Sequence, residues 1–187
     1  MSSDALSERG KVLEEIFFAE REQQRIAALK ERAATESAAE GLAEATHIDD
    51  GEVLKRVAEL GVSTDTLAAF SIVPMLFIAW GDKVLDNAER DAIMVEAVAA
   101  GIESGTPAYE LLSSWLTRTP QPELFEAWRA FHAELAPHLS ERERGALKED
   151  IVAKARRVAR ASGGFLGLGS VSADEAAALK KLEELLA

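Results

Sequence analysis

Signals for helix starts recur along this sequence, and they constrain its fold more than any other feature. In the clearest of them Asp or Ser precedes Glu by three residues, at Asp86–Glu89, Ser140–Glu143 and Ser172–Glu175. In such a capping box each side chain accepts a hydrogen bond from the backbone N–H of the other residue, which satisfies two donors in the first helical turn. Alternation of apolar and polar residues over strand lengths is absent. The pattern predicts an all-α protein.

The longest stretch without charged residues, 66–81, is the candidate centre of the core. It is apolar on all sides, which is typical of a helix surrounded by others. Pro74 lies within it and cannot donate to the preceding turn, so we expect a kink or a break there. The stretch is shorter than the roughly 20 residues needed to span a bilayer. We therefore expect no transmembrane segment.

Two further helix starts can be predicted, and the helix opened at the first capping box can be given an inner face. The helix opened by Asp86 is expected to bury Val95 and Val98 on its inner face. Thr106-Pro107 and Thr119-Pro120 each place a capping hydroxyl before proline, the residue preferred at the first helical position. Together with the capping boxes, these signals predict a bundle of about seven helices.

The N-terminal part of the chain differs in composition from this bundle. Residues 7–32 have a helical pattern with a long charged run, whereas 33–46 contain mainly Ala, Glu, Ser and Thr. The second stretch has little apolar material with which to pack, so we interpret it as a linker or a weakly held helix. The prediction is a helical arm with its linker over 1–47 and an all-helical domain over 48–187.

Apolar residues near the start of the arm are candidates for binding another surface. Leu13, Phe17 and Phe18 lie in a segment that otherwise carries many charges. Adjacent residues on a helix point in different directions, so only one of the two phenylalanines can share a face with Leu13. Docking onto the domain is one interpretation. Self-association or the capture of a protein partner is the other, since amphipathic helices commonly bind in this way.

Composition excludes several classes of partner. The formal net charge is −12, which disfavours nucleic acid and anionic lipid because both are bound through cationic side chains. The chain contains no cysteine, so disulfides, thiolate metal sites and cysteine nucleophiles are excluded. The N-terminal residues show no signal-peptide pattern. We expect a cytoplasmic protein, and no catalytic constellation of nucleophile, base and oxyanion donors can be recognised, so we do not expect an enzyme.

An acidic segment directly after the apolar stretch is the candidate ligand site. Asp82 follows that stretch, and Asp86 and Glu89 mark the next helix start. Three carboxylates at this spacing offer oxygen ligands for one divalent cation, the only candidate cofactor. Helix capping is the structural alternative for Asp86 and Glu89, and it accounts for both residues without a ligand. Both interpretations stay open from the sequence.

The same segment resembles the tellurite-resistance TerB family and its TerB-like relatives. Asp82, Leu85, Asp86 and Glu89 match the family's acidic, aliphatic, capping and glutamate positions, whereas Lys83 stands where the family has glycine. The resemblance implies an all-helical bundle. It also implies a non-enzymatic stress-response and interaction module, with acidic positions proposed to bind divalent metal.

A second match to the family pattern lies near the C-terminus, at Gly169, Val171, Ser172 and Glu175, with Leu168 in place of an acidic residue. The glycine-rich stretch 163–170 around it lacks the lysine of a phosphate-binding loop. We expect this stretch to be a connection that packs its apolar residues, Phe165 and Leu166, into the domain.

Three functions follow as hypotheses. The first is a non-enzymatic interaction module of TerB-like type, whose arm binds a partner or a second copy. The second is a divalent-metal sensor or metal-dependent enzyme that uses Asp82, Asp86 and Glu89. The third is a scaffold bundle without a ligand, in which the caps serve stability alone.

Overall fold

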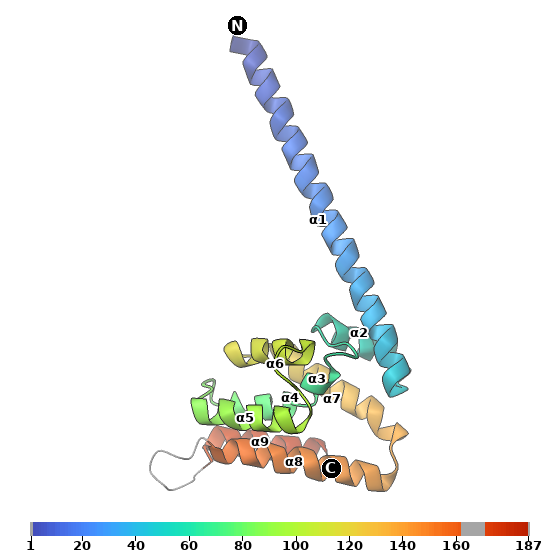
Figure 1. Cartoon of the computed structure of the whole chain (residues 1–187), viewed down its shortest axis with the longest axis vertical. Helices are drawn as coiled ribbons and strands as arrows, with labels where there is room; N and C mark the ends of the chain where they lie inside the picture. The colour runs from blue at the N-terminus through green and yellow to red at the C-terminus, as the bar shows by residue number, and fades with distance from the viewer. Residues whose placement is uncertain (1, 162–170, 187) are drawn as a thin grey trace. The chain divides into compact units, whose positions relative to one another are not determined.

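The computed structural model describes residues 2–161 and 171–186, with side chains described from residue 20 onward. These residues form helices and no strand, which confirms the all-α prediction (Figure 1). The α-helices are α1 Ser2–Thr46, α2 Gly51–Glu59, α3 Leu67–Phe70, α4 Val73–Ala79, α5 Asn87–Ala99, α6 Pro107–Thr117, α7 Pro122–Leu135, α8 Glu141–Ala161 and α9 Ala173–Leu185. A short 3₁₀ helix, η1 Ala136–His138, follows α7.

The chain divides into two compact units between Ser37 and Ala38. α1 is continuous through this boundary, so the linker expected over 33–46 is helical instead. The reason is Leu42, which is completely buried in the core of the second unit with Ala39 and Ala43 packed beside it. One leucine flanked by small residues anchors the end of α1, although the segment has little other apolar material.

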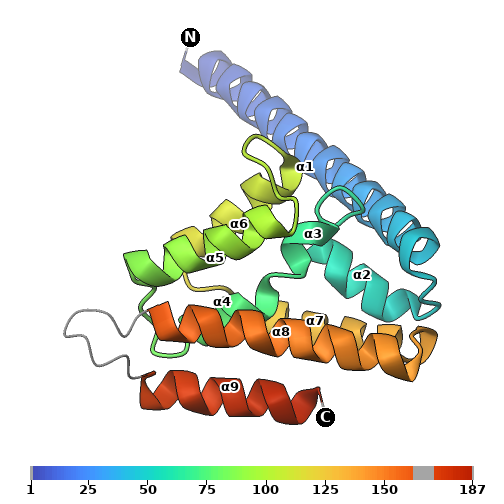
Figure 2. The same cartoon turned by 60° about the horizontal axis from the view of Figure 1, so that its bottom comes forward.

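The core of the second unit is built around α4, which packs against α5, α7, α8 and α9. The predicted break occurs at Pro74: α3 ends at Phe70, and α4 begins at Val73 with the proline in its first turn. Phe70 meets Phe131 of α7 edge to face, with their ring centroids 5.5 Å apart. Figure 2 shows α8 and α9 lying side by side along one face of this unit.

The inner face of α5 differs from the prediction. Val95 and Val98 are 66% and 68% exposed, whereas Glu96 and Ile93 are buried. Glu96 accepts two hydrogen bonds from Arg157 of α8, Nε to Oε1 at 2.6 Å and Nη2 to Oε2 at 2.9 Å. This two-point contact satisfies a buried carboxylate, and it turns the valines of α5 outward.

Most predicted helix starts are confirmed. All three capping boxes form, and the Thr106 hydroxyl accepts from the Tyr109 N–H at 3.3 Å. The start predicted at Thr119-Pro120 is wrong, because α7 begins at Pro122 after Gln121. The sequence there contains two prolines separated by one residue, and the second takes the first helical turn. None of the described helices is long and apolar enough to cross a bilayer.

Candidate functional site

The acidic segment forms a tight turn between α4 and α5. Gly81 stands where α4 ends, and a Cβ added to it would lie 2.9 Å from the Ile78 carbonyl oxygen and 3.6 Å from the backbone of Asp174. Glycine is therefore favoured by the crowded end of α4 at the Ile78 carbonyl, whereas the backbone of Asp174 in α9 lies at an ordinary contact distance. Lys83 has a φ of 70°, a left-handed conformation that glycine adopts without strain.

Asp82 serves the turn itself. Its Oδ1 accepts a hydrogen bond from the Val84 N–H at 2.9 Å, and the side chain is exposed. Such a bond from an Asp side chain to the backbone two residues ahead is a common way to stabilise a turn.

Asp86 and Glu89 form the predicted capping box at the start of α5. The Glu89 N–H donates to Asp86 Oδ1 at 2.7 Å, and the Asp86 N–H donates to Glu89 Oε2 at 2.9 Å. Each carboxylate thus has at least one oxygen bonded to backbone, which is the structural interpretation of these residues.

A second capping box faces the first. At the start of α9 the Ser172 N–H donates to Glu175 Oε2 at 2.7 Å, and the Glu175 N–H donates to Ser172 Oγ at 3.1 Å. The side chains of Glu89 and Glu175 are hydrogen-bonded to each other. They are only 3% and 2% exposed. The N-termini of α5 and α9 therefore meet through a pair of buried glutamates, which we call the glutamate pair.

The glutamate pair holds a proton. Burial raises the pKa of Glu89 to about 8, and the nearby carboxylates of Glu175 and Asp86 contribute to this increase, against the hydrogen bond from the Asp86 backbone. Two carboxylates in contact cannot both ionise without a large Coulomb penalty. At neutral pH Glu89 is therefore protonated while its side chain is hydrogen-bonded to that of Glu175.

The metal interpretation requires Asp82, Asp86 and Glu89 to turn their oxygens to one point. The structure places Asp82 in the exposed turn, Asp86 half-buried at the cap and Glu89 in the glutamate pair. Within the described part of the chain, no group of three or more His, Cys, Asp or Glu side chains is arranged to hold a metal ion. These residues do not fit a divalent cation in this arrangement, and metal binding at the segment stays a prediction.

The predicted partner-binding residues Leu13, Phe17 and Phe18 belong to α1, but their side chains lie outside the described ones. The side chains of the arm are described from Glu20 onward. Every side chain from residue 20 to 34 is exposed, including Ile26 at 44% and Leu29 at 57%. These two apolar residues are one helical turn apart and share a face of α1. Ile26 and Leu29 are not among the residues predicted to bind a partner, although their spacing is a recognisable signal.

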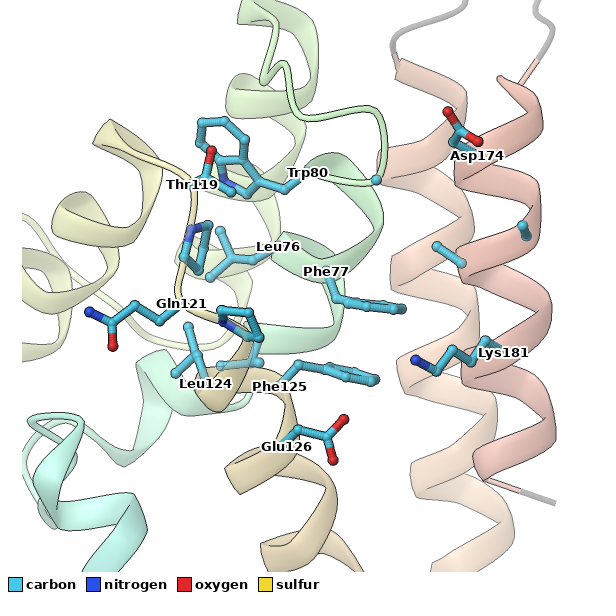
Figure 3. Close-up of a pocket in the computed structure, with 16 residues that line it drawn as sticks. Leu76, Phe77, Trp80, Thr119, Gln121, Leu124, Phe125, Glu126, Asp174 and Lys181 are labelled. Carbon is cyan, nitrogen blue, oxygen red and sulfur yellow. The ribbon is translucent and has the colours of Figure 1, made fainter.

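A cavity of about 500 Å³, which was not predicted, lies in the second unit between α4, the start of α7 and α9. Its walls include Leu76, Phe77 and Trp80, which were expected to be core residues. Figure 3 shows Phe77 and Phe125 with parallel rings on the side of the cavity that faces α9. The only sequence signal is the pair of prolines at 120 and 122, because they have no backbone N–H and interrupt regular packing there.

The stretch 163–170 lies outside the described residues, and with it the predicted packing of Phe165 and Leu166 and the family positions Leu168 and Gly169. Comparisons with family models, curated proteins and solved structures found no match to this chain. The resemblance to the TerB-like family therefore stays a prediction.

Proposed function

We propose that the protein is a non-enzymatic, TerB-like interaction module that associates through the arm of α1, with a second copy of the chain as its first partner. The observation that carries this proposal is the exposure of the arm. From residue 20 to 34 all side chains are exposed, and Ile26 and Leu29 form an apolar patch among charged neighbours.

The length and register of α1 support the proposal. In the sequence Phe18 precedes Leu29 by about three helical turns, a spacing that predicts a shared face in a continuous helix. The spacing of Leu13 and Phe17, one turn apart, predicts a second apolar face. An arm with two apolar faces is suited to bind other helices along its length. A second copy supplies the same faces and is the simplest partner by symmetry.

The glutamate pair fits a structural role in such a module. Its carboxyl groups are bonded to backbone N–H groups and to each other, so they hold the starts of α5 and α9 together. In the stress-response role that the family resemblance implies, the domain would serve as a rigid body that carries the arm.

Light scattering coupled to size exclusion tests the proposal on the full chain. We expect a mass above that of one chain that falls towards it on dilution, and a shift towards the monomer in the double variant Ile26→Gln, Leu29→Gln. The matched control is Val95→Gln, Val98→Gln, which removes two exposed apolar residues from α5. A monomer at every concentration, or an equal effect of both double variants, would contradict association through the arm.

A further inference from the structure

We propose that the cavity between α4, α7 and α9 is a binding site for a small amphipathic carboxylic acid, such as a free medium-chain fatty acid. Every lining residue lies within Ala38–Ala187, so the proposal is independent of the arm and of its function. A volume of about 500 Å³ is within the range of small-molecule sites in proteins.

The walls of the cavity suit an apolar chain. α4 contributes Val73, Leu76 and Phe77, and α7 contributes Leu124 and Phe125. The segment that enters α7 adds the prolines at 120 and 122, which carry no N–H donor. Phe77 and Phe125 stack with their ring centroids 3.8 Å apart and an interplanar angle of 8°. A ligand in this half-open cavity therefore meets mainly hydrocarbon along its walls, and its binding free energy comes mainly from buried apolar surface.

Lys181 of α9 supplies the charge that selects the head group. Its Nζ lies 5.4 Å from the centroid of the Phe77 ring and 5.8 Å from that of Phe125, and Figure 3 shows the side chain pointing towards these rings. It forms no ion pair with any described residue. Lys181 is exposed at the edge of the cavity, and a cation there without an anion complements a ligand that joins a carboxylate to an apolar chain.

The two acidic residues at the cavity have other interactions. Glu126 pairs with Arg129 one turn along α7. Asp174 lies in the first turn of α9, where the helix dipole favours a negative charge. It precedes Lys181 by about two helical turns, so its carboxylate does not compete for the lysine. The net charge of −12 repels small anions in general, so a carboxylate without an apolar chain is not expected to bind.

Calorimetry on the full chain tests the proposal with decanoate below its micelle concentration, together with decanol, decyltrimethylammonium and acetate. We expect one decanoate per chain, weaker binding of decanol, and no binding of acetate. The NMR signal of the Trp80 indole N–H, a group in the cavity wall that has no hydrogen-bond partner among the described residues, should shift on decanoate binding. Tighter binding of the cationic amphiphile, or no binding of decanoate, would overturn the proposal.

Three variants distinguish the contribution of the ligand's head group to binding from that of its apolar tail. Lys181→Gln should weaken decanoate at least about threefold and leave decanol unchanged, because only the charge pair is lost. Lys180→Gln is the matched control, since Lys180 is exposed on the same helix and does not line the cavity. Ala177→Leu fills the cavity from an exposed position that leaves the core intact, and it should weaken both ligands. If decanoate binds equally to the Ala177→Leu and unsubstituted chains, it binds elsewhere and the assignment is wrong.

Discussion

Replacing Glu89 with glutamine should stabilise the protein, and the gain should grow as the pH rises. In the Glu89→Gln variant the side-chain amide keeps an oxygen for the Asp86 N–H and offers an N–H to the Glu175 carboxylate, so the hydrogen bonds of the glutamate pair remain. What disappears is the titration of a buried carboxyl group whose pKa is raised to about 8, mainly by burial.

The direction of this pH dependence follows from proton binding to Glu89 in the folded and unfolded states. Below about pH 4.5 Glu89 is protonated whether the chain is folded or unfolded, and the pKa difference has no effect. Between about 4.5 and 8 the unfolded chain releases the proton and the folded chain keeps it, so the unfolding free energy falls as pH rises. The full difference corresponds to at most about 5 kcal/mol. Because a protein interior behaves as a medium of dielectric constant near 20, we expect about 2–3 kcal/mol at high pH.

Urea unfolding followed by circular dichroism at about pH 5, 7 and 9 measures this difference directly. Glu143→Gln is the matched control, because Glu143 holds the same position in an exposed capping box. Hydrogen bonds from the Ser140 side chain and backbone lower the pKa of Glu143, so its contribution to stability is present above its unfolded pKa and is lost on acidification. The two variants should therefore have opposite signs at neutral pH. If Glu89→Gln destabilises the protein at about pH 7 as Glu143→Gln does, Glu89 is already ionised in the folded state at that pH and our account of the pair fails.

Three other predictions concern the turn before α5. Lys83→Gly should raise the unfolding free energy by up to about 1 kcal/mol in urea titrations, because it relieves a left-handed backbone; a loss of stability would contradict the strain. Gly81→Ala should lower it by about 1–3 kcal/mol because the added Cβ crowds the Ile78 carbonyl, whereas Gly145→Ala, in open space on α8, should raise it by about 0.5–1 kcal/mol; equal effects would show that the end of α4 is not crowded at Gly81. In calorimetry with Ca²⁺, Mg²⁺ and Mn²⁺, the unsubstituted chain and the Asp82→Ala variant should give the same heat, because the Asp82 carboxylate is bonded within its turn. Binding heat that is lost in the Asp82→Ala variant would favour the metal-sensor alternative.

Local patterns in the sequence predict the helix starts well, because a capping box is satisfied by residues three apart and needs no distant partner. The same pattern cannot predict where the box lies in the fold. Glu89, Glu143 and Glu175 occupy equivalent positions in three boxes, yet the first and third are buried against each other and the second is exposed. Their meeting depends on the tertiary packing of α5 and α9, which are far apart in the sequence, against the same two helices, α4 and α8.

The wrong predictions for the inner face of α5 and for the end of α1 have the same origin. The inner face of α5 was predicted from the periodicity of its apolar residues, but Arg157, from α8, satisfies Glu96 inside. The end of α1 was predicted to be weakly held because alanines contribute little to burial, but Leu42 fits completely into the core. In both cases a partner distant in the sequence decides which residue is buried.

The buried polar groups of the domain bear on where its function lies. Glu89, Glu175 and Glu96 are held by backbone N–H groups, by each other or by Arg157, and an additional ligand would have to break these bonds. A buried carboxylate that loses its partner costs several kcal/mol, so ligand binding there would work against folding. The arm and the cavity carry no such penalty: Leu29 is exposed, and Lys181 has no ion-pair partner among the described residues. Binding at either surface removes apolar area from water or pairs a charge, and therefore stabilises the fold.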